Sequence, residues 1–447
     1  MVRVCGELAI AIVGSLFRGR TDLREAKANT AHYGEIIRGG EVLDEVVATV
    51  FRAPHSFTGE DTVEISCHGS MYIQQELLRW LVDAGCRLAK AGEFTQRAFL
   101  NGKVDLAEAE AVADLIASQS KAEKDLALKQ LKGSVSGEIA LLRDRLLRFT
   151  SLIELELDFA DHEELEFADR SELYTLANDI HKRLLALARS FEVGNALKNG
   201  IPVAIVGNTN VGKSTLLNHL LHEEKAIVSD VHGTTRDFIE DSTVINGIQF
   251  RFVDTAGIRD TDDVVENIGI ERTYQKMQEA KIVLWLVDRQ PEASEIEDIK
   301  KRVAGKKLII VRNKMDLTNS SWNNSSSAKP TIQHSTFNIQ NSSSVDISAK
   351  YGTNISKLEQ LIVEAANIPQ LSESDIVITS VRHYSALLHA DESLQRVIDS
   401  MNLGLSGDLL AEDLRMVIEH LGEITGEEKI TPQETLNSIF SSYCIGK

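Results

Sequence analysis

One short segment restricts the possible folds of this chain more than any other: Gly207-Asn208-Thr209-Asn210-Val211-Gly212-Lys213-Ser214. It lies between an apolar run at 203–206 and helix-forming residues at 215–218, the context that a phosphate-binding loop requires. The glycines allow backbone N–H groups to surround a phosphate, and the helix N-terminus attracts the anion. Lys213 is expected to bridge the β- and γ-phosphates, and the Ser214 hydroxyl to ligate Mg²⁺. The segment therefore predicts an α/β domain that binds a nucleoside triphosphate.

Three further segments support nucleotide binding, and the last two of them indicate which base is bound. Asp254-Thr255-Ala256-Gly257 follows an expected strand, where a carboxylate can hold the Mg²⁺ shell. Asn313-Lys314-Met315-Asp316 follows another strand, and the acceptor-only carboxylate of Asp316 suits the N1–H and exocyclic amine of guanine. Ser348-Ala349-Lys350 supplies a second guanine contact. This order and spacing are typical of small GTPases, so GTP is the predicted ligand, not ATP.

Ras-like hydrolases orient the attacking water with a Gln directly after the Asp-Thr-Ala-Gly segment, and here Ile258 stands at that position. Because an isoleucine side chain cannot bond water, the polar group that orients the attacking water must come from another part of the chain. Asn210 offers an amide oxygen near the phosphates, either to help hold a monovalent cation or only to stabilise the loop turn. Lys213 and Asn210 are therefore the candidate catalytic residues of the loop. The residues of these four segments that are expected to contact GTP are Asn210, Val211, Gly212, Lys213, Ser214, Thr215, Asp254, Thr255, Ala256, Gly257, Asn313, Lys314, Asp316, Ser348, Ala349 and Lys350.

The rest of the chain surrounds this α/β part with different patterns. Short β-rich runs at 203–206, 250–253, 282–287 and 308–311 predict buried parallel strands of a doubly wound, mostly parallel sheet. Residues 106–191 and 370–431 are rich in Ala, Leu, Glu and Lys and contain no proline, which predicts long helices. The α/β domain is thus expected to be inserted into a helical one.

The first hundred residues differ again and predict a small α+β domain. Strands are expected at 46–51 and 62–67, and an amphipathic helix at 71–84. A segment rich in Ser and Asn, 319–344, is expected to be a surface loop. The predicted domains are 1–103 (N-terminal), 104–196 (helical, first part), 197–369 (α/β) and 370–447 (helical, second part).

Charge and cysteine content limit the possible partners and compartment. The chain has 67 acidic and 48 basic residues, and its formal net charge is −19. Such a surface repels nucleic acid at long range, so any RNA contact must be local or supplied by a partner. The four cysteines are scattered without a CxxC pair, which fits a reducing cytoplasm. No apolar run is long enough for a membrane span, so a soluble cytoplasmic protein is expected.

Several motifs together resemble one family. They are Gly233-Thr234-Thr235-Arg236-Asp237, Phe57-Thr58-Gly59-Glu60-Asp61, Arg97-Ala98-Phe99-Leu100-Asn101-Gly102-Lys103 and the terminal Cys444-Ile445-Gly446-Lys447. From Met1 to Lys447, in the same order, the chain resembles the tRNA modification GTPases of the MnmE (TrmE) family. The resemblance implies an N-terminal folate-binding domain that dimerises, a discontinuous helical domain, and a Ras-like P-loop G domain inserted within it.

The resemblance also implies an activity and partners. The family acts with the flavoprotein MnmG (GidA), as a heterotetramer, to add an aminomethyl-type group, such as carboxymethylaminomethyl, to C5 of the wobble uridine of certain tRNAs. The one-carbon unit comes from 5,10-methylene- or 5-formyl-tetrahydrofolate. GTP hydrolysis requires Mg²⁺, is stimulated by K⁺ and is coupled to pairing of G domains. The tRNA is expected to be gripped largely by the partner.

Site residues follow from the resemblance position by position. Potassium is assigned to Asn210, Ser229, Val231 and Thr234, and Mg²⁺ to Ser214 and Thr235. Of these, Ser229, Thr234 and Thr235 are also assigned to GTP binding. Glu266 matches the glutamate that positions the attacking water. Arg3, Glu64, Lys103 and Lys447 match the family's folate-contacting positions. Their chemistry agrees, since a carboxylate accepts from a 2-aminopyrimidinone edge and cations suit the folate carboxylates. Cys444 is either a group near the one-carbon unit or a plain buried cysteine.

Two alternative functions fit the sequence less well. A regulatory GTPase like the Era or Der proteins would carry a KH-type RNA module or a second G domain, and neither is found in the sequence. A folate-storage or scaffolding protein would not need intact Lys213, Ser214 and Asp254.

Family members usually carry an extra strand and a Pro-Pro-Gly-type turn before the position of Arg3. Either the start codon was chosen late or that strand is absent.

Overall fold

The computed structural model describes residues 1–158, 170–222, 241–253, 278–317, 342–369, 372 and 375–426. The chain divides into two compact units. The first comprises Met1–Ala117, Ala127–Ala188 and Val381–Lys447, and the second comprises Ser118–Leu126 and Arg189–Ser380. Along the sequence, the second unit thus falls between parts of the first. None of the helices within the described ranges combines the length and the apolar character needed to cross a membrane.

The first unit begins with a five-stranded antiparallel sheet in the order β1-β5-β4-β3-β2. Inward-facing Val46, Ala48 and Val50 alternate with outward-facing residues, and they pack with Leu77 and Trp80 of α2 in one core. The elements are β1 Val2–Cys5, α1 Ala9–Leu16, β2 Phe17–Gly19, β3 Thr30–Arg38, β4 Glu41–Phe51, β5 Thr62–Ser66 and α2 Met71–Asp83.

Both strands and the helix expected in this region are confirmed, although β4 is longer than predicted. It begins at Glu41, because residues 41–45 pair with the end of β3 in a hairpin that carries polar side chains outward. Backbone pairing in a hairpin does not require an apolar pattern along the exposed strand, so the periodicity alone did not reveal these residues.

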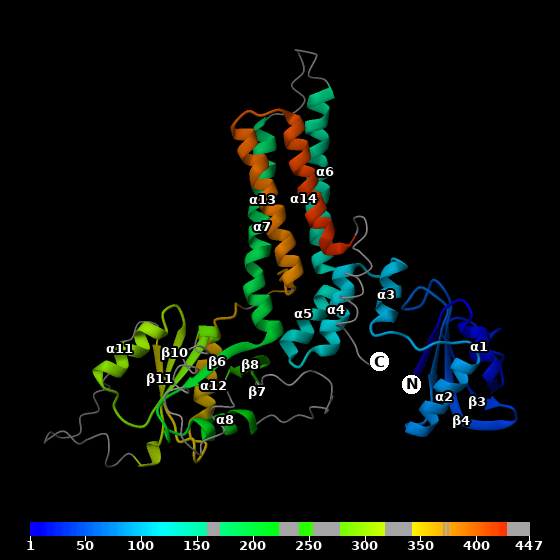
Figure 1. Cartoon of the computed structure of the whole chain (residues 1–447), viewed down its shortest axis with the longest axis horizontal. Helices are drawn as coiled ribbons and strands as arrows, with labels where there is room; N and C mark the ends of the chain where they lie inside the picture. The colour runs from blue at the N-terminus through cyan, green and yellow to red at the C-terminus, as the bar shows by residue number, and fades with distance from the viewer. Residues whose placement is uncertain are drawn as a thin grey trace. The chain divides into compact units, whose positions relative to one another are not determined.

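Long helices form the remainder of the first unit. They are α3 Glu93–Leu100, α4 Leu106–Ala117, α5 Lys121–Leu131, α6 Ser134–Asp158, α7 Arg170–Asn199, α13 Val381–Asn402 and α14 Gly407–Thr425, with parts of α5 and α7 in the second unit. Helices α6, α7, α13 and α14 lie side by side (Figure 1). His181 on α7 contacts Asp391 on α13, with Nδ1 and Oδ1 2.6 Å apart. Helices from before and after the second unit therefore share one bundle.

The second unit contains a six-stranded sheet in the order β11-β10-β9-β6-β8-β7. All neighbouring strands are parallel except the β7–β8 hairpin. The four runs predicted as strands form β6 Ile201–Val206, β8 Ile248–Val253, β9 Ile282–Val287 and β10 Lys307–Arg312, and the others are β7 Asp241–Ile245 and β11 Ser342–Asp346. Helices α8 Lys213–His222, α11 Ala293–Arg302 and α12 Ile355–Ala366, with a 3-10 turn at Met315–Leu317, complete the described part.

Separate apolar cores lie on the two faces of this sheet. One contains α8 and α12 residues and the other contains α11 residues, so every residue of β9 is buried. This double burial explains the unbroken apolar runs. The prediction of a surface loop at 319–344 is wrong at its end, since Ser342–Ser344 belong to β11, and residues 319–341 lie outside the described residues. An edge strand is selected by the backbone of its neighbour β10, and its Ser-rich sequence has no strand signal of its own.

Candidate functional site

The predicted phosphate loop connects β6 to α8, and its two glycines are required by space as well as by conformation. Gly207 has φ +153°, and a Cβ there would overlap the Leu286 carbonyl oxygen. Gly212 has φ +99°, and a Cβ there would overlap the Asn313 side-chain nitrogen. The loop thus fits closely between the ends of β9 and β10, with backbone at its surface where a phosphate would bind.

Lys213 lies half-buried at the start of α8. Its Nζ donates to the carbonyl oxygens of Gly207 and Asn208, each at 2.8 Å. Burial lowers the pKa of the Lys213 ammonium. Desolvation disfavours the charged form, so an anionic phosphate next to this ammonium would stabilise it. This local chemistry fits a nucleoside triphosphate.

Two neighbouring residues of the loop bear on metal binding. Ser214 is half-buried in the first turn of α8, beside Lys213, and its hydroxyl could be a Mg²⁺ ligand together with phosphate oxygens. The described residues contain no cluster of three or more His, Cys, Asp or Glu that could hold a metal alone. Asn210 has φ +59°, a left-handed turn conformation that Asn tolerates. This conformation supports the turn-stabilising role for Asn210, and cation binding stays a prediction.

A buried asparagine joins the phosphate loop to the base-reading segments. Asn313 is 4% exposed. Its Nδ2 donates to the Val211 carbonyl oxygen at 2.7 Å, and its Oδ1 accepts from the Ala349 backbone N–H at 2.9 Å. Ser348 Oγ donates to Asp316 Oδ1 at 2.6 Å. Three of the four predicted GTP-binding segments therefore meet at the carboxyl ends of β6, β10 and β11, as expected for a ligand site in a parallel sheet.

The remaining base-segment residues have partners that the motifs did not predict. Lys314 has φ +63°, and its Nζ lies 2.7 Å from Asp288 Oδ2. Lys350 Nζ lies 5.2 Å from the ring centroid of Tyr351. Asp288 directly follows β9, so the rule that carboxyl ends of parallel strands meet at one edge would have found it.

A glutamate of α11 reaches the phosphate loop. Glu295 Oε1 accepts from Asn208 Nδ2 at 3.4 Å and from Arg289 Nη2 at 2.8 Å. Burial raises the pKa of Glu295, but backbone and side-chain hydrogen bonds, with the charge of Arg289, lower it overall. Glu295 also forms the capping box of α11 with Glu292. The Glu292–Glu295 spacing is a capping signal in the sequence, but nothing in it indicated a contact with the loop.

Several predicted residues lie outside the described residues. They include the switch and Mg²⁺ segments and the C-terminal motif: Ser229, Val231, Thr234, Thr235, Asp254, Thr255, Ala256, Gly257, Glu266, Cys444 and Lys447.

Three of the four predicted folate residues lie around one loop of the first unit. Arg3 on β1 pairs with Glu64 on β5, with Nε and Oε1 2.8 Å apart, because the two residues are opposite each other in the β1–β5 register. The Arg3 guanidinium carbon lies 5.8 Å from the ring centroid of Phe57 in that loop. Lys103 Nζ donates to the Pro54 carbonyl oxygen of the same loop at 3.1 Å. These three side chains, two cations and one carboxylate, fit a ligand with carboxylates and a hydrogen-bonding ring.

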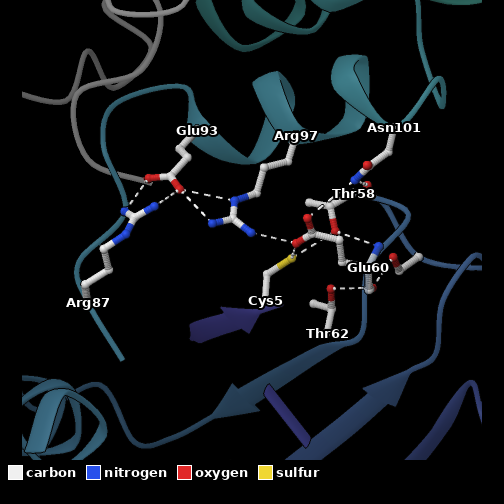
Figure 2. A network of polar contacts seen from close by, with 9 residues as sticks. Cys5, Thr58, Glu60, Thr62, Arg87, Glu93, Arg97 and Asn101 are labelled. Carbon is white, nitrogen blue, oxygen red and sulfur yellow. Dashed lines mark hydrogen bonds and ion pairs between the residues drawn. The ribbon is translucent and has the colours of Figure 1, made fainter. Parts of the chain in front are cut away.

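A polar network runs beside these residues and connects β1, the 56–60 loop and α3 (Figure 2). Arg97 Nη1 donates to Glu60 Oε2 at 2.7 Å, and Arg97 Nη2 donates to Glu93 Oε1 at 2.9 Å. The Cys5 thiol donates to Glu60 at 3.2 Å, and burial raises the pKa of this thiol. Arg87, helped by a backbone N–H and by Arg97, lowers the pKa of Glu93 to about 2 against its burial. The sequence motifs contain Glu60 and Arg97 but did not indicate Cys5, Arg87 or Glu93.

Comparisons with known proteins cover the whole chain. Residues 1–103 match the family model of the GTP-binding protein TrmE N-terminus, and residues 106–444 match that of the MnmE helical domain. The chain is 52% identical, over 100% of its length and 96% of the relative, to a protein of Parabacteroides distasonis named tRNA modification GTPase MnmE. Proteins of the same name from Bacteroides fragilis strain ATCC 25285 and Christiangramia forsetii are 50% and 48% identical, each over 100% of this chain and 96% of the relative.

A solved structure aligns with a part of the chain only. It is the FeoB G-domain of Methanococcus jannaschii, 26% identical over 37% of this chain and 96% of that one, with a TM-score of 0.25. A TM-score this low supports no conclusion about the fold. The two family models and the full-length relatives, by contrast, show the family. This chain belongs to the MnmE (TrmE) family of tRNA modification GTPases.

Proposed function

We propose that this chain hydrolyses GTP and, with a flavoprotein of the MnmG (GidA) type, adds an aminomethyl-type group such as carboxymethylaminomethyl to C5 of the wobble uridine of certain tRNAs. Membership in a family of tRNA modification GTPases supports this proposal. The observation that carries it is the buried Asn313, which bonds the phosphate loop through Val211 and the base-reading segment through Ala349. Phosphate binding and base recognition are thereby parts of one site.

GTP is bound and oriented by residues with distinct tasks. Asp316 reads the guanine edge, and Ser348 keeps its carboxylate in place through the 2.6 Å hydrogen bond. Lys213 places a positive charge where negative charge grows during phosphoryl transfer. Mg²⁺, held by Ser214 and Thr235, would supply charge neutralisation at the phosphates.

Two further groups take over the function of the glutamine whose position is occupied here by Ile258. Glu266 orients the attacking water, and potassium held by Asn210, Ser229, Val231 and Thr234 adds positive charge beside the phosphates. Both follow from the family resemblance and from the apolar side chain at position 258, which cannot bond water.

The first unit would bind the one-carbon donor, 5,10-methylene- or 5-formyl-tetrahydrofolate. Glu64 accepts from the 2-aminopyrimidinone edge of the pterin, and Arg3, Lys103 and Lys447 bind carboxylates. Because Arg3 and Glu64 already form an ion pair, ligand binding would share or open that pair. Cys444 is proposed near the one-carbon unit.

The family resemblance implies the assembly, and the proposed domains are 1–103, 104–196, 197–369 and 370–447. We expect a cytoplasmic homodimer joined through the N-terminal domain, and a heterotetramer with the flavoprotein, which provides most of the tRNA contact. The net charge of −19 supports this division of labour, because it does not favour autonomous RNA binding.

Wobble-uridine nucleosides of cellular tRNA, measured by mass spectrometry, test this function. A strain that lacks the protein should lose the C5-modified nucleosides. Wild type should restore them, and Lys213→Ala should not, because the phosphate-binding cation is gone. Lys301→Ala, on the exposed face of α11, is the matched control and should restore them. Identical nucleosides with and without the protein would contradict the proposal and favour a regulatory or scaffolding GTPase.

A further inference from the structure

Three of the proposed folate residues lie in the described part of the first unit, and of these three only Arg3 and Glu64 belong to the sheet. Arg3 and Glu64 are register partners on adjacent strands, so main-chain hydrogen bonds fix their spacing. Lys103 follows α3, which is not part of the sheet. Some other contact must therefore set the distance between Lys103 and the Arg3–Glu64 pair.

The polar network of Figure 2 provides such a contact. Arg97, in the middle of α3, reaches the 56–60 loop through Glu60 at 2.7 Å. One helical turn later, Asn101 Nδ2 donates to the Thr58 carbonyl oxygen of the same loop at 2.8 Å. Gly59, at φ +79°, allows close approach, since a Cβ there would lie 3.2 Å from carbons of Asn101 and Lys103. The loop and the end of α3 are thus held together side by side.

The same two segments each carry an aromatic ring beside Arg3. The guanidinium carbon of Arg3 lies 5.8 Å from the ring centroid of Phe57 in the loop and 5.4 Å from that of Phe94 on α3. Both distances are within cation–π range. The contact between Arg97 and Glu60 therefore links the two segments that flank the Arg3 side chain, and it also links the segment that carries Lys103.

The Arg97–Glu60 pair is placed to act as a stiff link. Their side chains are only 30% and 28% exposed, so water screens the pair less than it screens a surface ion pair. The Arg97 guanidinium is also held at its other side by Glu93, which is 8% exposed. Burial raises the pKa of Glu60, but hydrogen bonds from Cys5 and Arg97 lower it overall. Glu60 thus stays ionised and bound at neutral pH.

We propose that Arg97 and Glu60 are positioning residues of the folate site, which hold α3 against the 56–60 loop at the spacing that lets Arg3, Glu64 and Lys103 bind one ligand. This inference rests on the proposed function of those three residues. Neither Arg97 nor Glu60 needs to touch the ligand, because each acts through the segment to which it is bonded.

Arg87 is a matched control within the same network. It contacts Glu93 through both of its terminal nitrogens, but its side chain is 62% exposed, and it lies on the far side of the network from the 56–60 loop (Figure 2). Removal of Arg87 breaks an ion pair of the same chemical type and leaves the Arg97–Glu60 contact in place.

The test is calorimetric titration of the full-length protein with 5-formyl-tetrahydrofolate, alongside thermal unfolding of each variant. Arg97→Met and Glu60→Gln are each expected to bind about tenfold or more weakly, as for loss of a charge-assisted hydrogen bond. The double variant should bind no more weakly than the worse single variant, because both changes break one link. Arg97→Lys retains a donor and a charge and should recover part of the affinity. Arg87→Met should bind as the wild type does.

Each outcome decides the matter. If Arg97→Met unfolds at the wild-type temperature and binds the folate as tightly as wild type, the positioning role is wrong. If Arg97→Met is unstable, the same test applies to Glu60→Gln. Additive losses in the double variant would also overturn it, as would an equal loss in Arg87→Met, since either result means a general effect of charge removal. If wild-type protein does not bind the folate at all, the proposed folate site itself is wrong, and this inference falls with it.

Discussion

We propose that the choice of base depends on Asp316. One of its carboxylate oxygens accepts from Ser348 at 2.6 Å, so the side chain has a defined orientation next to the segment that Asn313 bonds to the phosphate loop. An ionised carboxylate offers acceptors only, and guanine presents an N1–H and an amine to it. Adenine lacks that pair of donors in this arrangement.

Asp316→Asn tests this assignment. The amide introduces donors that suit the 2-oxo group of xanthine and leaves the guanine donors without a full acceptor. We expect loss of GTP affinity and gain of xanthosine triphosphate affinity, measured by competition with a fluorescent nucleotide. Unchanged GTP affinity in the variant would show that another segment reads the base.

Gly212 has a stricter requirement than most glycines in the chain. It combines φ +99° with a position where any Cβ would overlap the side chain of Asn313. Gly212→Ala should therefore displace Asn313 from Val211 and weaken GTP binding by at least about tenfold, since positive φ alone costs on the order of 1–3 kcal/mol in a non-glycine residue. Calorimetric titration with GTP measures this loss.

Gly137 provides the contrasting substitution. It lies on α6, and a Cβ added there would have no other atom within 4 Å. Gly137→Ala should stabilise the helix by roughly 0.5–1 kcal/mol, because alanine loses less backbone entropy there. If Gly137→Ala lowered the melting temperature, or Gly212→Ala left GTP affinity unchanged, the corresponding account of glycine would be wrong.

At the scale of elements, an ionic cluster joins three helices of the first unit. Arg382 on α13 donates to Glu110 on α4 at 2.8 Å and to the Ile424 carbonyl oxygen near the end of α14 at 3.0 Å. It also donates to the Glu423 carbonyl oxygen. The last carbonyls of α14 therefore have a donor that the helix itself cannot supply. Glu110 and His383 are both almost fully buried, with Glu110 Oε2 and His383 Nε2 3.0 Å apart.

This cluster predicts a specific pH dependence of stability. Burial raises the pKa of Glu110, but His383 and Arg382 lower it to about 2, below its usual value of 4.5. A lowered pKa contributes stability that is complete above the unfolded value and is lost as pH falls from about 4.5 toward 2. Glu110→Gln should therefore lower the melting temperature at pH 7 and reduce its pH dependence over that range. The variant also leaves the partly buried Arg382 without its anion, which adds to the loss.

Melting curves of the first unit's transition, recorded from pH 7 to pH 3, measure the effect. Glu412→Gln is a suitable control, because the Glu412 side chain is 71% exposed on α14 and its ion pair with Arg415 is long, at 3.7 Å. The control should melt as wild type does. Equal pH slopes for wild type and Glu110→Gln would mean that Glu110 is not ionised in the folded protein as its contacts require.

At the scale of the whole molecule, hydrolysis is expected to require potassium and pairing of two G domains. A cation held by Asn210 and the 229–234 loop would neutralise charge that an arginine finger neutralises elsewhere, while Glu266 orients water. Sodium is smaller and should fit the same ligands poorly. We predict turnover that is fast in potassium and slow in sodium, and an Asn210→Ala variant that is insensitive to the choice of salt. Glu266→Ala should abolish turnover and spare nucleotide affinity.

Steady-state GTPase rates at equal concentrations of the two salts measure this. Equal wild-type rates would exclude the potassium mechanism. A normal rate in Glu266→Ala would exclude its water-positioning role. Sedimentation in each salt, with a transition-state analogue bound, would show whether G-domain pairing follows the same dependence.

What could be predicted from the sequence depends on how local each signal is. The phosphate loop lies within a single strand–loop–helix segment, and its glycine spacing is dictated by backbone sterics within that segment. The strands β6, β9 and β10 were predictable because burial on both faces leaves an unbroken apolar run. In β8, Arg251 interrupts the run, and the buried Phe250, Phe252 and Val253 indicated the strand. The edge strand β11 was not, since its Ser-rich sequence pairs only because β10 presents a free edge.

The same distinction applies to the sites. The sequence by itself predicted which residues would read phosphate and guanine, since each motif is a short run whose chemistry does not depend on distant residues. Only the tertiary structure decided that Asp288 pairs with Lys314, that Arg3 pairs with Glu64, and that Arg97 pairs with Glu60. Most of these contacts join residues far apart in the chain, and all depend on strand register and helix packing. No local pattern encodes them, because side-chain partners are chosen by the folded geometry.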